Sequence, residues 1–217
     1  MEISEVEERI KLLEKLGGII REESRAYGII DTVWGFAILA GFLIFQMVEI
    51  LSLPWFYGLI PLIVLLSLAF ALTVYFKRKI GEQLGYKRAG WLGNKIKKTW
   101  LATALIGGTA YMLVFWSPPV ADIILKDVSP GEISGLILLG WLIIDGIGCM
   151  VQGIISESRF YTAIGFMMII SAVVVANISF VYSWSAFALT FGLGYLVGGL
   201  RDYRMFKSSR KAGVRIE

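Results

Sequence analysis

Six apolar stretches, each near 20 residues long, constrain the fold of this 217-residue chain more than any other feature. They cover residues 28–51, 54–76, 100–117, 133–155, 161–182 and 185–200. A helix of about 20 residues is long enough to cross a hydrocarbon layer of about 30 Å. The pattern therefore predicts an all-α, polytopic membrane protein whose residues 28–200 form a bundle of six transmembrane helices.

The distribution of Lys and Arg predicts the orientation of these helices. Twenty of the 21 basic residues lie before the first stretch, after the second, after the fourth or after the sixth, and only Lys126 lies on the other side. Basic residues accumulate in the cytoplasmic connections of membrane proteins. We therefore expect a multi-pass protein of the cell membrane with both termini cytoplasmic, including a basic tail at residues 201–217.

The largest connection on the expected cytoplasmic side, residues 77–99, mixes basic and apolar side chains, whereas the outer connection 117–132 is acidic. Such a mixture is typical of segments that lie among lipid headgroups. We expect residues 77–99 to bind membrane lipids, with docking of a cytoplasmic protein as the alternative. The basic residues concerned are Lys77, Arg78, Lys79, Lys87, Arg88, Lys95, Lys97 and Lys98.

Composition argues against several kinds of chemistry. Hydrophobic residues make up 57% of the chain, and histidine is absent, which removes His-type zinc and haem sites and Ser-His-Asp hydrolysis. The single cysteine, Cys149, cannot form an internal disulfide, and there is no nucleotide-binding motif. We expect no enzymatic activity, no cofactor and no metal. The basic residues lie beside the membrane, so they do not indicate nucleic acid, and the scarcity of Asn and Gln suggests a thermophilic source.

Residues 1–27 are expected to form a cytoplasmic amphipathic helix. Ser4 and Glu7 fit a capping box, and apolar residues recur at alternating separations of three and four. A helix that lies on a bilayer has a basic polar face, whereas this segment has more acidic than basic residues. We therefore favour packing on protein, either a cytoplasmic partner or a second copy, over packing on the membrane. We expect the Gly17–Gly18 pair to interrupt the helix.

Asp145 is the strongest candidate for a functional residue, because it lies near the middle of the fourth apolar stretch. A carboxylate at that depth costs roughly 2.5–3.5 kcal/mol on insertion scales, and no Lys or Arg lies within the apolar stretches. We expect Asp145 to be neutral and to face the bundle, with Cys149 and Gln152 on the same helical face. Asn177 is a candidate hydrogen-bond partner. Alternative partners are the hydroxyl groups of Thr103, Thr109, Tyr111 and Ser171.

Three roles for Asp145 stay open at this point: a hydrogen bond between helices, which we favour, a proton- or cation-coupled site, and catalysis. The other polar residues have simpler interpretations. Gln46 and Glu49 are three residues apart near the outer end of the first stretch, where they form either an interfacial pair or an outer vestibule. Asp31 is expected in the first turn of its helix. Trp100 and Tyr161 are expected at membrane boundaries.

Small residues are frequent in the later stretches. Gly194 and Gly198, like Ala188 and Gly192, have the four-residue spacing that lets membrane helices approach closely. We expect these residues to pack helices within one chain rather than between two.

Three functions fit these observations. We expect a transport component of non-enzymatic type, either a permease or the membrane subunit of a larger transporter. A regulatory or scaffold membrane protein that docks a cytoplasmic partner is the first alternative. A small carrier or channel that uses Asp145 to bind a proton or cation is the second.

Overall fold

The computed structural model describes residues 3–84, 95, 98–115, 117–118 and 130–211, and these residues contain helices and no strand. The long helices are α1 (Ile3–Ile50), α2 (Phe56–Leu84), α6 (Pro130–Ile155), α7 (Arg159–Ile178) and α9 (Leu193–Lys211). The short α8 (Ser183–Phe187) leads into α9. Five helical segments of the described chain are long and apolar enough to span a membrane. The all-α prediction is therefore confirmed.

Residues 100–115 of the third predicted span, 100–117, are helical, but this segment is not among these five. It consists of a π-helical segment, η1 (Ala102–Gly107), followed by α4 (Gly108–Phe115). The number of six spans therefore stays a prediction. Lys87, Arg88 and Lys97 of the connection 77–99 lie outside the described residues, as does most of the outer connection 117–132.

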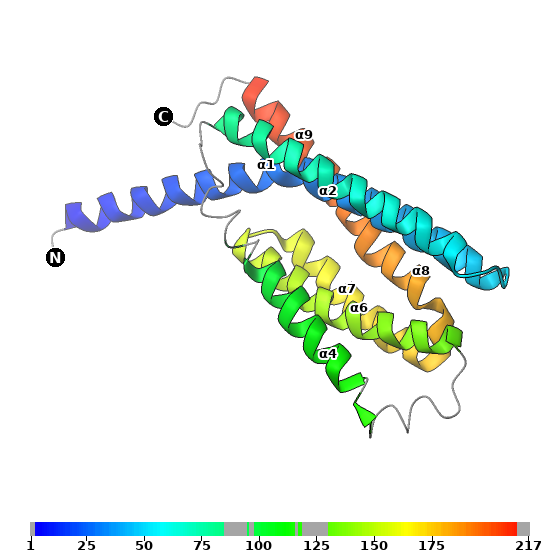
Figure 1. Ribbon diagram of the computed structural model, residues 1–217. Helices are drawn as coiled ribbons and strands as arrows, with labels where there is room; N and C mark the ends of the chain where they lie inside the picture. Colours follow the sequence, from blue (N-terminus) through cyan, green and yellow to red (C-terminus); the bar gives the residue numbers. More distant parts are fainter. Residues whose placement is uncertain (1–2, 85–94, 96–97, 116, 119–129, 212–217) are drawn as a thin grey trace.

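The helices form two groups, as Figure 1 shows. α1 packs along both α2 and α9, while α6 packs against α7 and α4. The groups meet where α6 and α7 contact α8 and where α7 contacts α9. The main hydrophobic core lies across this junction and includes Ile38 of α1, Leu142 of α6, Met168 of α7 and Phe187 of α8. Residues from distant parts of the chain therefore surround the interior of the bundle.

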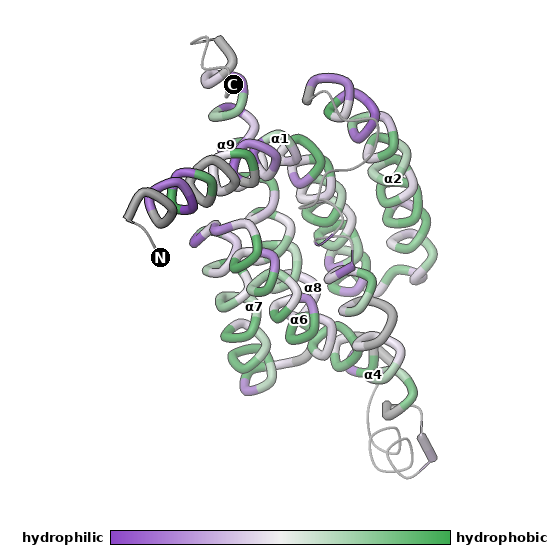
Figure 2. The backbone as a smooth tube through the Cα atoms, turned by 90° about the vertical axis from the view of Figure 1, so that its left-hand side faces the viewer, coloured by the Kyte–Doolittle hydropathy of each residue, from purple (hydrophilic) through white to green (hydrophobic). Residues whose placement is uncertain are grey.

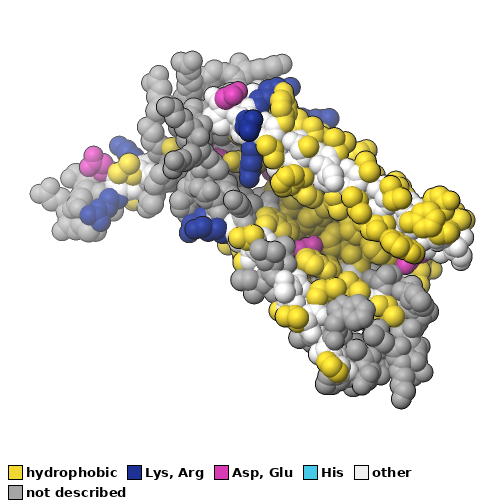
Figure 3. Space-filling model, viewed as in Figure 1, with side chains coloured by type: hydrophobic (Ala, Val, Ile, Leu, Met, Phe, Trp, Pro, Cys, Tyr) yellow, Lys and Arg dark blue, Asp and Glu magenta, His cyan; other side chains and the backbone are white. Residues whose placement is uncertain are grey.

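Charged and apolar side chains separate along the bundle. Hydrophilic residues gather at the end where α1 begins and α9 ends (Figure 2), and the Lys and Arg side chains visible in Figure 3 lie on that half. Apolar side chains cover the other half of this face, including much of α2. Such a large exposed apolar surface would be unfavourable in water. It is the surface expected of helices that contact lipid.

α1 is one continuous helix, which corrects the predicted break at Gly17 and Gly18. Each glycine costs a helix only about 1 kcal/mol relative to alanine, and good helix formers lie on both sides of the pair. At 1.5 Å per residue, its 48 residues extend about 72 Å, more than twice a membrane core of about 30 Å. The N-terminal half of α1 therefore projects beyond the bundle, as Figure 1 shows.

The structure describes the backbone of this projecting part, but not most of the side chains that define its amphipathic pattern. Of those that are described, Ile10 and Leu12 are exposed, with 50% and 57% of their surface accessible. The packing of residues 3–26 on protein therefore stays a prediction.

Glycines allow the helices to approach closely within the chain. A Cβ atom at Gly28 would lie 2.6 Å from the carbonyl oxygen of Gly199, and a Cβ atom at Gly192 would lie 2.6 Å from the backbone nitrogen of Leu39. These positions join α1 to η3 and α9. Gly194 and Gly198 contact α7 instead, against Ile164 and Phe160. The predicted use of these small residues for packing within one chain is confirmed.

Within the described ranges, two segments adopt π-helical rather than α-helical hydrogen bonding. They are η1 and η3 (Ala188–Gly192), which joins α8 to α9. π-Helical turns are uncommon and occur often at functional sites. Trp100 precedes η1 and Tyr195 follows η3. Both residues belong to the interior polar cluster described next.

Candidate functional site

Gln152 of α6 lies at the centre of a buried polar cluster. Its side-chain oxygen, Oε1, accepts a hydrogen bond of 2.7 Å from Trp100 Nε1 and another of 2.7 Å from the hydroxyl of Tyr195. An indole N–H can only donate, so the amide oxygen rather than its nitrogen must face Trp100. Gln152 is only 4% exposed. One side chain thus connects α6, α9 and the segment that leads into η1.

Cys149 and Tyr161 extend this cluster. The Sγ atom of Cys149 lies 3.5 Å from the Tyr195 hydroxyl oxygen and 3.8 Å from Met168 Sδ. The rings of Tyr195 and Tyr161 meet edge to face, with centroids 5.2 Å apart. Cys149, Tyr161 and Tyr195 are all buried. The three side chains therefore form a compact group of proton-bearing atoms inside the bundle.

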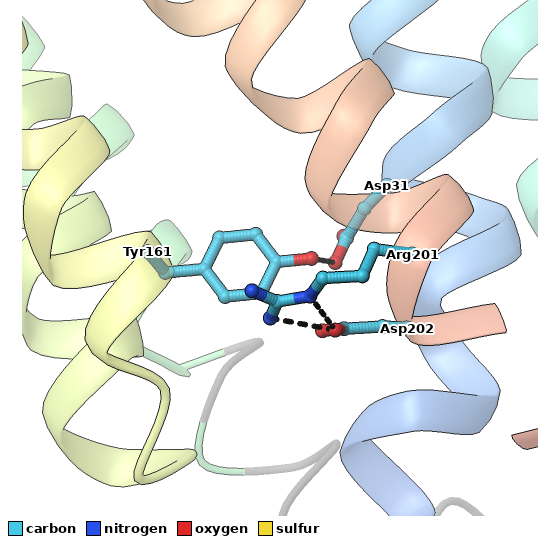
Figure 4. A network of polar contacts seen from close by, with 4 residues as sticks. All are labelled: Asp31, Tyr161, Arg201 and Asp202. Carbon is cyan, nitrogen blue, oxygen red and sulfur yellow. Dashed lines mark hydrogen bonds and ion pairs between the residues drawn. The ribbon is translucent and has the colours of Figure 1, made fainter. Parts of the chain in front are cut away.

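Asp31 of α1 joins this cluster through Tyr161 of α7, as Figure 4 shows. Its Oδ2 atom accepts a hydrogen bond of 2.5 Å from the hydroxyl of Tyr161. Asp202 lies within electrostatic range of Asp31 and is held by Arg201, whose Nε and Nη2 atoms donate to Asp202 Oδ1 at 2.9 and 2.8 Å. Hydrogen bonds and close ring contacts thus lead from Asp202 and Asp31 to Gln152.

The position of Asp31 corrects the expectation of a first-turn residue. α1 begins at Ile3, so the amides near Asp31 are already bonded within the helix, and the carboxyl is directed at α7 instead. Tyr161 lies in the first turn of α7, near the end of a candidate span, so its position at a membrane boundary stays a prediction. Its side chain is 1% exposed and donates to Asp31.

Asp145 lies on the same face of α6 as Cys149 and Gln152, as the helical spacing predicts. Its residue is 9% exposed, and Leu142 and Cys149 on either side are fully buried. Cys149 follows Asp145 by four residues, about one turn of α6. Among the described residues, however, no side chain or backbone group forms a hydrogen bond with Asp145. A buried polar group without a partner is uncommon in native structures and calls for an explanation.

Asn177 is not the partner of Asp145, which corrects that prediction. Its side-chain nitrogen donates to the carbonyl of Val173, one turn earlier in α7, at 2.7 Å. The amide is exposed beside Val173, Val174 and Ile178, so this face of α7 is directed away from α6. Two of the alternative hydroxyl partners are also engaged elsewhere, because Thr103 donates to Thr99 and Tyr111 donates to Leu136.

Gln46 joins α1 to α8. Its Oε1 atom accepts hydrogen bonds from the backbone nitrogen of Ser185 at 3.2 Å and from the Ser185 hydroxyl at 3.0 Å. Gln46 is buried, whereas Glu49 is half-buried one turn further along α1. The structure therefore engages Gln46 in a contact between helices, and an outer vestibule formed with Glu49 stays a prediction.

The basic residues proposed for lipid or partner docking are described only in part. α2 continues to Leu84, so Lys77, Arg78 and Lys79 lie on a helix rather than in a loop. All three are exposed, as are Lys95 and Lys98. Ile80, next to them, is buried against Ala26 of α1 and Phe206 of α9. This packing holds the basic end of α2 beside the bundle.

The sequence analysis did not identify Asp31, Tyr161, Tyr195 and Trp100 as members of one cluster. The available signal was weak: Asp31 follows an apolar pair within a long helical segment, and Tyr195 lies in the middle of the last apolar stretch. Helical periodicity places residues on the faces of their own helices. It does not predict which faces of distant helices meet.

Asp31, Cys149, Tyr161 and Tyr195 carry carboxyl, thiol or hydroxyl groups and lie in helices that are long and apolar enough to span a membrane. Gln152 and Trp100 only accept or donate hydrogen bonds, and Trp100 lies outside these helices. No group of three or more Cys, Asp or Glu side chains in the described part of the chain is arranged to hold a metal ion. Comparisons with protein-family models, curated proteins and solved structures find no match to this chain.

Proposed function

We propose that this protein is a transport protein of the cell membrane, of non-enzymatic type, in which Asp145 binds a proton or a small monovalent cation. Both termini are cytoplasmic in this proposal, since the Lys and Arg side chains visible in Figure 3 gather on the half of the bundle where α1 begins and α9 ends. The observation that carries the proposal is the burial of Asp145 in an apolar helix without a hydrogen-bond partner among the described residues.

The surroundings of Asp145 support a functional role over a structural one. A carboxyl that bonds two helices together needs a partner on the second helix, and Asn177 does not supply one. A buried acidic group that stabilises nothing is costly. Within membranes such groups commonly belong to proton or ion pathways. The cost of burying Asp145 is therefore best explained by a binding function.

The interior cluster offers a route between Asp145 and the cytoplasmic end. Cys149 lies near Asp145 and contacts the hydroxyl of Tyr195, whose ring packs on Tyr161, and Tyr161 donates to Asp31. A ring contact passes no proton, so this proposal requires the hydroxyl groups of Tyr195 and Tyr161 to form a hydrogen bond with each other during transport. The geometry of these side chains suits a proton better than a metal ion, which needs several charged ligands around one point.

The test is ion flux into proteoliposomes that contain the purified full chain and a trapped pH-sensitive dye. Under an imposed pH gradient, the wild type should acidify the lumen faster than empty vesicles do, and Asp145→Asn should slow this by about tenfold or more. Glu157→Gln is the matched control, because Glu157 is exposed and lies in the turn between α6 and α7, outside the candidate spans. Equal rates for Asp145→Asn and the wild type, with both variants folded, would contradict the proposal.

A scaffold function is the second candidate, and the projecting half of α1 supports it. Ile10 and Leu12 are exposed there, beyond the helices that pack together. Deletion of residues 1–20 should abolish copurification of a cytoplasmic protein, such as a transport ATPase, if this candidate holds. The same deletion should leave proton flux intact if Asp145 alone carries the function, so the two candidates are distinguishable.

A further inference from the structure

A basic pocket at the charged end of the bundle is not used by the proposed transport function. Its volume is about 390 Å³, and it lies between α1, the turn that joins α6 to α7, and the beginning of the charged part of α9. Four arginines and two acidic residues line it, so its charged groups are positive in sum. These residues are Arg21, Arg25, Arg159, Arg201, Glu157 and Asp202.

Two of the four arginines form ion pairs with acidic residues of the pocket, and the other two form none with the described residues. Arg21 forms an exposed ion pair with Glu157 at 3.3 Å, which is worth little in water. Arg201 is held by Asp202. Arg25 and Arg159 form no ion pair with any described residue. Their guanidinium groups can therefore bind a ligand without breaking an existing contact.

The beginning of α7 supplies further donors to the same pocket. Ser158 caps this 20-residue helix, but its side chain makes no capping hydrogen bond, and its Oγ atom is buried without a partner. The first backbone N–H groups of a helix have no partner within the helix and carry partial positive charge. Together with arginine side chains, they form a site suited to a phosphate group.

The position of the pocket matches the depth of lipid headgroups. Ser156 and Ser158 line it, and they lie between the last residue of α6 and the first residue of α7, where two candidate spans end. Basic pockets between helices at the cytoplasmic surface are typical sites for anionic lipid headgroups. We propose that this pocket binds a phosphate group, carried either by an anionic phospholipid or by a soluble phosphate.

Native mass spectrometry of the detergent-purified full chain tests the lipid source. Dioleoylphosphatidylglycerol should bind more tightly than dioleoylphosphatidylcholine, and the double variant Arg25→Gln/Arg159→Gln should weaken phosphatidylglycerol binding by about tenfold or more. The control Arg204→Gln/Lys207→Gln removes the same charge from exposed basic residues of α9 that do not line the pocket. It should leave binding within about twofold of the wild type.

Isothermal titration calorimetry with sodium phosphate tests the soluble source, with sodium chloride as the salt control. Phosphate binding that depends on Arg25 and Arg159 supports the proposal with a soluble ligand, and lipid binding that depends on them supports it with a headgroup. Arg25→Lys/Arg159→Lys keeps the charge and the fold, and should bind with intermediate affinity because lysine lacks the bidentate guanidinium. If neither ligand binds, or if the Gln and control variants lose binding equally, the proposal is wrong.

Discussion

Replacing Gln152 by leucine tests whether the interior cluster holds the helices together. Leucine fills a similar volume but accepts no hydrogen bond, so it strands the indole N–H of Trp100 and the hydroxyl of Tyr195. A hydrogen bond contributes about 0.5–1.5 kcal/mol net, and bonds between membrane helices average about 0.6 kcal/mol. Two lost bonds should therefore lower the free energy of unfolding by about 1–3 kcal/mol.

The matched control is Asn177→Leu, which removes another side-chain amide from a candidate span. The Asn177 amide is exposed and bonds only to its own helix among the described residues, so its loss should change the free energy of unfolding by less than about 0.5 kcal/mol. Unfolding by SDS in mixed micelles, followed by far-UV circular dichroism, measures both variants. A double-mutant cycle with Tyr195→Phe isolates the Tyr195–Gln152 bond. Equal losses in the two variants, or none in Gln152→Leu, would refute the reasoning.

The same unfolding assay tests four further variants. Gly35→Ala should destabilise the protein by about 1–3 kcal/mol, because the new Cβ would collide with the α9 backbone. Gly17→Ala should be neutral or stabilise the protein by up to about 1 kcal/mol, because no atom lies within 4 Å of the new Cβ. Tyr161→Phe should cost about 1–3 kcal/mol, because it removes the donor to the part-buried carboxyl of Asp31. Arg21→Gln should cost less than about 0.5 kcal/mol, because its ion pair with Glu157 is exposed; a larger loss would mean that this pair is shielded from water.

The long apolar helices were predictable because hydrophobic length is a local property of the sequence. The predicted end of the first stretch lies within one residue of Ile50, where α1 ends, and the fourth stretch ends with α6 at Ile155. The break at Gly17 and Gly18 was wrong, because the small helical cost of two glycines is outweighed by the flanking sequence.

Only the part of the site that lies on α6 was predictable from the sequence. Spacing placed Cys149 and Gln152 beside Asp145, since residues three, four and seven apart share a helical face. It could not identify Trp100 and Tyr195 as the donors to Gln152, because those contacts depend on how three separate helices pack. Asn177 was chosen for its polarity alone, and polarity does not say which side of α7 faces the bundle.

The π-helical turn η3 has a consequence for how the chain tolerates changes in length. A π turn contains one residue more than an α turn, and one residue corresponds to about 100° of rotation around a helix. α8 is fixed to α1 through Ser185 and Gln46, and α9 is fixed to the same helix through the contact between Gly28 and Gly199. Deleting one residue from Ala188–Gly192 would restore α-helical geometry but rotate these two attachments out of phase. The chain would then keep either the Gln46 contact or the orientation of Tyr195 toward Gln152, but not both.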